Sequence, residues 1–299
     1  MQTNRPIMNK TLRTLLIAWL VVLSTPASAA TLHTEKSLYR NIVVYTEQDQ
    51  RCMRFGRYDG TRQSCMSVRE PDRLVFNYTR MMMGALYLNP NPQRVLIIGL
   101  GGGTLPNTLQ KLFPAAHIDV VEIDPAVVKV ARKYFDFDPA GKIRVAEEDG
   151  RVFVKRALRQ TTRYDLVMLD AFDHEYIPEH LLTREFLQEI RTLLTERGVL
   201  AANTFSSSRL YDYESITYQS VFGDFFNLKD ANRVILTRLG GLPDRAELQR
   251  NAAAFAGKFK ALDVDSDFLL SRMTIRQDWP ANTRVLTDQY SPANLLNSR

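Results

Sequence analysis

The chain has 299 residues, of which 45% are hydrophobic, with 39 basic residues, 33 acidic residues and two cysteines. This composition is enough to bury the core of one large α/β domain with a small appendage. Three of the basic residues lie in the first 29 positions, so the remaining 36 against 33 acids leave a net charge of only +3. No basic stripe with interleaved aromatic residues is present, which makes nucleic acid a poor candidate partner.

The N-terminus has the pattern of an export signal. Arg5, Lys10 and Arg13 form a basic region without acids, a short apolar run follows at Leu15–Leu23, and Ala27–Ala29 has the A-x-A form of a cleavage site. We therefore expect cleavage after residue 29, periplasmic localisation and no stable membrane span in the mature protein. The alternative is an uncleaved signal that anchors the protein in the membrane.

The segment 36–70 is predicted to form short strands, because it is rich in residues that favour β-structure. Cys52 and Cys65 flank a predicted turn at Phe55–Gly60. If the chain is exported, a disulfide between the two cysteines is the natural interpretation, and two unpaired thiols on opposite faces are the alternative. The spacing of Cys and His residues suggests no zinc site, so no metal is expected.

Residues 73–88 carry apolar side chains at helical spacing and are predicted to form one amphipathic helix. From Arg94 onward, strand and helix patterns alternate, which is typical of a parallel sheet with helices on both faces. The expected strands are Val95–Ile98, Ile118–Val121, Ile143–Val145, Leu166–Leu169 and Gly198–Asn203. The expected helices are Leu105–Phe113, Pro125–Phe135, Arg151–Arg159 and Thr183–Thr195.

An antiparallel edge hairpin is expected at Phe225–Leu228 and Arg233–Thr237, followed by a helix near Ala246–Leu262 and an irregular tail. The predicted fold class is thus α/β, a Rossmann-like, doubly wound, mainly parallel sheet with a small N-terminal β-domain. We place the boundaries at 1–29 for the signal peptide and 30–72 for the β-domain. The catalytic domain is then 73–240, and the C-terminal helix and tail are 241–299.

The first strand of the alternating region ends in a glycine-rich turn that contains Gly99, Gly101 and Gly103. This G-x-G-x-G spacing differs from the dinucleotide fingerprint, which has its third glycine at the sixth position. It is the form found in folds that bind S-adenosylmethionine or its relatives. Glu122 ends the next strand, where a carboxylate can hold a ribose diol. A nucleoside-containing ligand is therefore favoured over a merely structural turn.

Further acids follow the next two strands. Asp149 stands where it can accept from an adenine amine, although helix capping alone also explains such a residue. Asp170 faces the reactive end of the ligand, because the carboxyl ends of parallel strands meet at one crevice. Tyr211 opens a later helix near the crevice, where it lines either a substrate pocket or a packed surface. His174 and His180 fit no familiar metal motif.

Several motifs in order resemble the polyamine aminopropyltransferases, the spermidine synthase family. They are VLIIGLGGG from Val95, VVEIDP from Val120, EDGR from Glu148 and LDAFD from Leu169. With GLGGGTL, HLLT and LTD-x-Y-x-P, the chain looks closest to a divergent branch of that family. The resemblance implies transfer of an aminopropyl group from decarboxylated S-adenosylmethionine to an amine such as putrescine, and a homodimer is a further expectation.

The resemblance also implies roles for single residues: Glu122 binds the ribose, Asp149 the adenine amine and Asp170 an amine, with Asp173 as a second acid. Tyr78 matches a tyrosine of the substrate pocket. The sequence departs from the family pattern at Gly102, where the loop aspartate is missing, and at Arg40, Arg80 and Gly84, which replace Gln, Glu and His.

Losing an anion and gaining cations weakens the binding of a dication. Loss of the loop aspartate also removes repulsion against a carboxylate, so an S-adenosylmethionine-dependent methyltransferase is the first alternative. A non-catalytic exported binding module of the same fold is the second.

Overall fold

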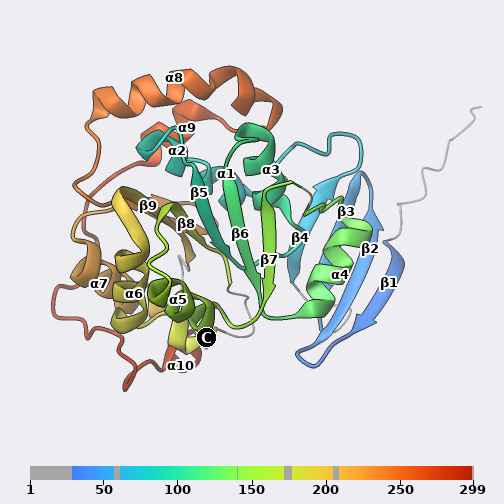
Figure 1. The fold of residues 1–299 in the computed structure, drawn as a ribbon, viewed down its shortest axis with the longest axis horizontal. Coiled ribbons are helices and arrows are strands. Elements are labelled where there is room, and N and C mark those ends of the chain that lie inside the picture. The colour runs from blue at the N-terminus through green and yellow to red at the C-terminus, as the bar shows by residue number, and fades with distance from the viewer. Residues whose placement is uncertain (1–28, 57–60, 140, 172–176, 205–208, 298–299) are drawn as a thin grey trace, which may run out of the picture.

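The computed structural model describes residues 29–56, 61–139, 141–171, 177–204 and 209–297, and it contains two β-sheets (Figure 1). The strands of the small antiparallel sheet are β1 (Ala30–Lys36), β2 (Asn41–Glu47), β3 (Gln50–Phe55) and β4 (Arg62–Ser67). Those of the large sheet are β5 (Arg94–Ile98), β6 (His117–Glu122), β7 (Ile143–Glu147), β8 (Tyr164–Leu169), β9 (Leu194–Thr204), β10 (Phe226–Lys229) and β11 (Arg233–Arg238). The predicted fold class is confirmed.

The large sheet has the order β10-β11-β9-β8-β5-β6-β7, in which β9 to β7 run parallel and β10 and β11 form an antiparallel edge. The chain enters this sheet at β5, and its connections leave in opposite directions, to β6 on one side and to β8 on the other. The carboxyl ends of β5 and β8 are therefore a topological switch point, where ligands bind in open α/β sheets.

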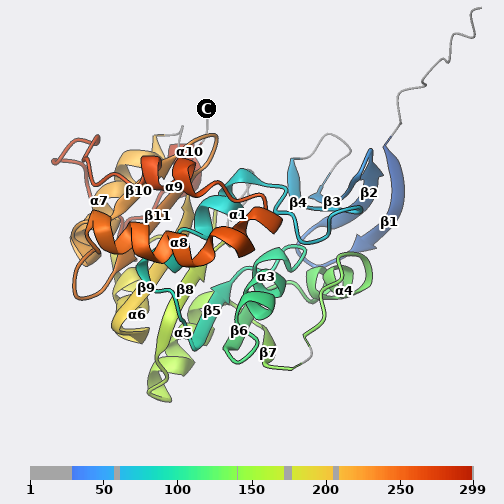
Figure 2. The ribbon, with the colours of Figure 1, turned by 90° about the horizontal axis from the view of Figure 1, so that it is seen from above.

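Helices cover both faces of this sheet (Figures 1 and 2). They are α1 (Asn77–Met82), α2 (Ala85–Leu88), α3 (Thr104–Leu112), α4 (Pro125–Tyr134), α5 (Gly150–Arg159), η1 (Glu179–Leu181), α6 (Arg184–Leu193), α7 (Leu210–Phe222), α8 (Arg245–Ala261), α9 (Ser266–Arg272) and α10 (Ala293–Asn297). Side chains alternate across a strand. Val95 and Ile97 of β5 therefore join the core under α1, α2, α3 and α8, whereas Leu96 and Ile98 join the core under α5, α6 and α7.

The small sheet packs against α4, whose other side contacts the core of the large sheet. Val127 and Val130 of α4 lie with Ile42 and Met53 of the small sheet in one buried cluster. Cys52 and Cys65 stand opposite each other on β3 and β4, and the structure joins them in a disulfide. This sheet is thus fixed beside the carboxyl edge of the large sheet, where its strand β4 becomes part of a cavity wall.

The structure corrects the sequence-based prediction in three places. The expected helix over 73–88 is two short helices, because the N–H groups of Met83 and Gly84 bond to carbonyls three residues earlier, which tightens the chain into a turn between α1 and α2. Strand β1 was not predicted. It is a mostly exposed edge strand, so its sequence lacks the alternation of apolar and polar residues that indicates a strand. The expected irregular tail contains the short helices α9 and α10.

The predicted signal sequence lies almost wholly outside the described residues, and β1 begins at Ala30. In the part of the chain that the structure describes, no helix combines the length and the apolar character needed to cross a membrane.

Candidate active site

The glycine turn after β5 allows two segments to approach closely at the switch point. Gly99 has φ +99°, and a Cβ there would lie 2.2 Å from the carbonyl oxygen of Asp170 at the end of β8. Gly103, the N-cap of α3, has φ +81°, and its Cβ would lie 2.7 Å from the ring of Phe137. Only glycine fits such positions. Gly99 and Gly101 also line the cavity at this edge of the sheet.

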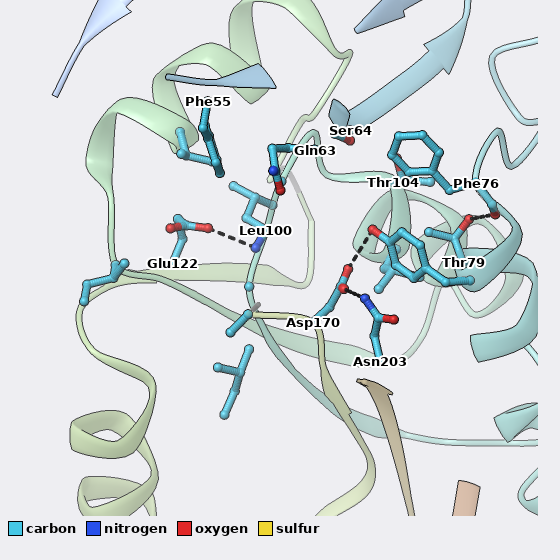
Figure 3. Close-up of a pocket in the computed structure, with 18 of the residues that line it drawn as sticks. Phe55, Gln63, Ser64, Phe76, Thr79, Leu100, Thr104, Glu122, Asp170 and Asn203 are labelled. Carbon is cyan, nitrogen blue, oxygen red and sulfur yellow. Dashed lines mark hydrogen bonds between the residues drawn. The ribbon is translucent and has the colours of Figure 1, made fainter. Parts of the chain in front are cut away.

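Glu122, at the end of β6, is held by backbone N–H groups on both of its oxygens. Oε2 accepts from Leu100 at 3.1 Å, a bond shown in Figure 3, and Oε1 accepts from Asp124 at 3.0 Å. Burial raises the pKa of Glu122, and these hydrogen bonds oppose that rise. The side chain is therefore a fixed acceptor beside the glycine turn, as expected for a group that binds hydroxyls.

Asp149 is the N-cap of α5, and both of its carboxylate oxygens have partners. Oδ1 accepts from the backbone N–H groups of Arg151 and Val152 at 2.9 and 3.0 Å. Oδ2 lies 2.8 Å from Nε2 of His180, and both side chains line the cavity. Because an ionised carboxylate only accepts, the imidazole donates here. Capping thus uses one oxygen, which leaves Oδ2 on the cavity side with one neighbour.

Asp170, at the end of β8, is held by side chains from two other elements (Figure 3). Tyr78 of α1 donates to Oδ2 at 3.2 Å, and Asn203 of β9 donates to Oδ1 at 3.0 Å. Burial raises the pKa of Asp170, the two hydrogen bonds lower it and the charge of Glu122 raises it, and together these effects bring the pKa to about 7. Burial also raises the pKa of Tyr78 well above its usual range, so the phenol stays protonated. Asp170 can therefore exchange a proton near neutral pH.

These acids share one cavity of about 1060 Å³. Figure 3 shows Leu100 between Glu122 on one side and Asp170 with Asn203 on the other. Other residues in the wall include Phe55, Gln63, Ser64, Val75, Phe76, Thr104, Ile123 and Leu181. This volume is at the upper end of the range found for small-molecule binding sites.

Two departures from the family pattern have a structural counterpart. A Cβ on Gly102 would lie 2.7 Å from Ser64 Oγ and 3.0 Å from the ring of Phe135, so Ser64 takes the space that a loop aspartate needs. Nη1 of Arg80 lies 2.6 Å from Oδ2 of Asp263, which pairs the charge of this cavity residue. The carboxylate of the loop aspartate is missing at Gly102, as the sequence indicated. The added positive charge of Arg80 is balanced by Asp263, which lies outside the described cavity wall.

The predicted site residues are not all brought together. Tyr211 is absent from the described cavity wall: its hydroxyl contacts Asp278 and accepts from Asn227 at 2.9 Å, and its ring lies 4.1 Å from the guanidinium of Arg233. Those partners are supplied by the edge hairpin and the chain after α9, away from the switch point. Asp173 lies outside the described residues. Among the residues that are described, no group of three acids, histidines or cysteines is placed to hold a metal.

Sequence reasoning missed Asn203 and Ser64. Asn203 ends the predicted strand Gly198–Asn203 at the same sheet edge as Asp170, so a polar residue at that position was a usable signal. Ser64 lies in the separate small sheet, and no pattern in the sequence places that sheet against the glycine turn.

Comparison with known proteins agrees with this geometry. Residues 75–234 match the family described as the spermine/spermidine synthase domain. Over 291 residues the chain is 48% identical to a polyamine aminopropyltransferase of Vibrio vulnificus (strain CMCP6), and the alignment covers 94% of this chain and 97% of that relative.

Solved structures show the same fold at low sequence identity. A probable spermidine synthase from Corynebacterium glutamicum superposes with a TM-score of 0.64 at 18% identity, covering 85% of this chain and 98% of that one. Spermidine synthase from Thermotoga maritima gives 0.61 at 19% identity, with 83% and 85% covered. The family match over more than half of the chain and the nearly complete alignment with the 48% identical relative show that this chain belongs to the spermine/spermidine synthase family.

Proposed function

We propose that this protein is a polyamine aminopropyltransferase, which moves the aminopropyl group of decarboxylated S-adenosylmethionine onto an amine such as putrescine. The observation that carries the proposal is the position of Asp170, a buried carboxylate with a pKa of about 7 that shares a cavity with Glu122 and the glycine turn. The name of the Vibrio vulnificus relative supports the same activity.

In this reaction Asp170 is the proton acceptor. The acceptor amine attacks the carbon next to the sulfonium sulfur, so that an N–C bond forms as the C–S bond breaks and the sulfur keeps the electron pair. The products are methylthioadenosine and an amine longer by one aminopropyl group. The attacking nitrogen must lose a proton, which ionised Asp170 takes up. Tyr78 and Asn203 hold the carboxylate in place for this step.

We assign the nucleoside of the donor to the part of the cavity around the glycine turn. Glu122 accepts from the ribose hydroxyls, because its two oxygens are already oriented by Leu100 and Asp124. Oδ2 of Asp149 accepts from the adenine amine, since its other oxygen is occupied by the cap of α5. Gly99 and Gly101 leave room for close approach of the ligand to the backbone.

The amine groups of both substrates meet less negative charge than the family pattern would provide. Ser64 replaces the loop acid near Gly102, so a hydroxyl rather than a carboxylate faces an ammonium there. Asp173, as a second acid beside Asp170, remains a proposal from the resemblance. We expect weaker binding of the donor ammonium than in a site with the loop aspartate, because one Coulomb partner is lost.

The direct test uses residues 30–299, incubated with decarboxylated S-adenosylmethionine and putrescine. Mass spectrometry should detect methylthioadenosine and spermidine in equal amounts, and Asp170→Asn should reduce both. No product above the level of Asp170→Asn would contradict the proposal. If the protein also fails to bind methylthioadenosine, the non-catalytic binding module is the hypothesis that remains.

Methyl transfer is the second candidate, and the neutral contact between Gly102 and Ser64 favours it. Without the loop acid, the carboxylate of intact S-adenosylmethionine meets no repulsion from position 102. The same assay with intact S-adenosylmethionine distinguishes the two reactions. Formation of S-adenosylhomocysteine, with no methylthioadenosine from the decarboxylated donor, would favour the methyltransferase.

We further propose that the mature protein starts at Ala30 and is exported to the periplasm. Strand β1 begins at that residue, so cleavage after Ala29 would keep every described helix and strand. The disulfide between Cys52 and Cys65 suits an oxidising compartment. N-terminal sequencing of the protein from a periplasmic fraction tests this. Retention in the membrane fraction with an intact N-terminus would instead indicate an anchor.

The homodimer expected from the resemblance is also a proposal. Strand β1 is an edge of the small sheet, and Leu32 on it is 46% exposed, so this edge is open to a second copy. Sedimentation velocity on residues 30–299 measures the oligomeric state, and a monomer at micromolar concentration would contradict it.

A further inference from the structure

The motif LTD-x-Y-x-P near the C-terminus has no part in the proposed chemistry, yet it contacts the segment that closes one side of the cavity. That segment contains η1, and Pro178, His180 and Leu181 line the cavity. A 3₁₀ helix of three residues has too few internal hydrogen bonds to fix its own position. Its placement therefore depends on what packs behind it.

The first contact runs through Asp288. Its carboxylate accepts from Arg151 Nη1 and Nη2 at 2.6 and 2.8 Å, and from the hydroxyl of Thr183 at 2.7 Å. Arg151 also donates to the backbone oxygen of His180 at 3.3 Å. The guanidinium beside Asp288 holds the pKa of that carboxyl below its usual range. Glu189 accepts from the same guanidinium, from Nε and Nη2 at 3.0 Å each. Asp288 and Glu189 together thus orient Arg151 on η1, each through a bidentate pair.

The second contact runs through Asn294 on α10. Its backbone N–H and its Nδ2 both donate to Oε1 of Glu179 at 3.1 Å. Its side chain also bonds the backbone of Ile177, accepting at 3.0 Å and donating at 3.1 Å. Ser291 adds a bond to the carbonyl of Glu179 at 2.9 Å. Residues 288–294 therefore hold η1 directly at Glu179 and, through Arg151, at the carbonyl of His180.

Apolar packing reinforces this arrangement. Leu286 and Ala293 are fully buried against Ile177, Leu182 and Leu210. These two side chains anchor residues 286–294, which we name the C-terminal strap, behind η1. In front of the strap, η1 presents Nε2 of His180 to Oδ2 of Asp149 at 2.8 Å.

We propose that the C-terminal strap positions His180 on Asp149 and in this way sets the affinity for the nucleoside of the donor. Asp288 and Asn294 are positioning residues, because they act through Arg151 and Glu179 and do not line the described cavity wall. The inference rests on the proposed function, in which Asp149 accepts from the adenine amine. The strap fixes His180, and His180 contacts one lone pair of Asp149 Oδ2. The Asp149 carboxylate therefore keeps the orientation in which the other lone pair of Oδ2 faces the ligand.

The test compares Asp288→Asn and Asn294→Ala with a matched control, Glu247→Gln. Glu247 also accepts from a buried arginine, Arg238, at 2.6 Å, but it lies on α8 outside the described cavity wall. Calorimetric titration with methylthioadenosine should give a Kd about tenfold higher for each strap variant, and a Kd within twofold of wild type for the control. The KM for the acceptor amine should not change.

A double-mutant cycle ties the effect to His180. His180→Ala should raise the Kd by a similar factor, and the double variant His180→Ala with Asp288→Asn should be no weaker than either single variant. Additive losses, or strap variants that bind like wild type, would overturn the inference. If Asp288→Asn does not fold, as judged by circular dichroism, Asn294→Ala decides the outcome.

The failure of this inference differs from the failure of the proposed function. If the wild-type protein binds methylthioadenosine and forms spermidine, and the strap variants bind methylthioadenosine equally well, only the inference about the strap is refuted. If the wild-type protein binds no methylthioadenosine, both the inference about the strap and the proposed function are refuted.

Discussion

The two parts of the cavity hold their carboxylates in different ways. Glu122 accepts from backbone N–H groups in the turns after β5 and β6. Asp149 accepts from backbone N–H groups in the first turn of α5. In the part of the chain that the structure describes, the Asp170 carboxylate instead accepts from the side chains of Tyr78 on α1 and Asn203 on β9.

Under the proposed function, this difference separates ligand binding from proton transfer. Backbone N–H groups are rigid donors, and at Glu122 they oppose the rise in pKa that burial causes, which suits a fixed acceptor of hydroxyl or amine hydrogens. Asp170 is buried with two neutral side-chain donors, and burial raises its pKa to about 7, which suits a group that gains and loses a proton. Four predictions, made for three variants, test this contrast.

The largest effect is expected for Asp170→Asn on the rate. The variant has no group to take the proton of the attacking amine, so kcat should fall by about 10²- to 10⁴-fold. Initial rates of methylthioadenosine formation measure this, and the Kd for methylthioadenosine should remain near the wild-type value. A variant that retains more than a tenth of the wild-type kcat would show that Asp170 is not the proton acceptor.

The same variant should be more stable than wild type at pH 8. The pKa of Asp170 is raised in the folded state from 3.8 to about 7, so its contribution to stability is lost as the pH rises through this window. At pH 8 the cost of burying the charge has an upper limit of about 4 kcal/mol. Chemical denaturation should show an advantage of Asp170→Asn at pH 8 that shrinks at pH 5. Parallel pH profiles for the two proteins would argue against a raised pKa.

An effect of intermediate size is expected for Glu122→Gln on donor binding. The amide of glutamine has one acceptor oxygen in place of the two carboxylate oxygens of Glu122. Either the N–H of Leu100 or that of Asp124 would therefore lose its acceptor. We expect the Kd for methylthioadenosine to rise about 10- to 100-fold. The acceptor KM should change little, because the acceptor lies near Asp170; an equal loss for both substrates would mean that the two parts of the cavity are not separate.

The smallest effect is expected for Tyr78→Phe. Loss of this hydrogen bond raises the pKa of Asp170 above about 7, because the bond from Tyr78 lowers it. The acid limb of kcat/KM should therefore move to higher pH, with an activity about 3- to 10-fold lower at pH 7 and little difference at pH 9. Tyr211→Phe is the control, since its hydroxyl contacts Asp278 and Asn227. A uniform loss at every pH would indicate a packing defect instead.

The sequence by itself determined the parts of the site that depend on short stretches of chain. Apolar runs that end in glycine or acid locate the carboxyl ends of β5, β6 and β8, and these ends must meet in a doubly wound sheet. Gly99, Glu122 and Asp170 were therefore predictable, as was the N-cap position of Asp149.

Only the tertiary structure decided which distant side chains complete the site. Ser64 reaches the glycine turn from a separate sheet, and Tyr78 reaches Asp170 across 92 residues of sequence. Tyr211 turned inward, to partners supplied by the edge hairpin and the chain after α9. Local patterns give the direction of a strand and the face of a helix. The packing of one element on another depends on side-chain shape across the whole core, which no short stretch of sequence contains.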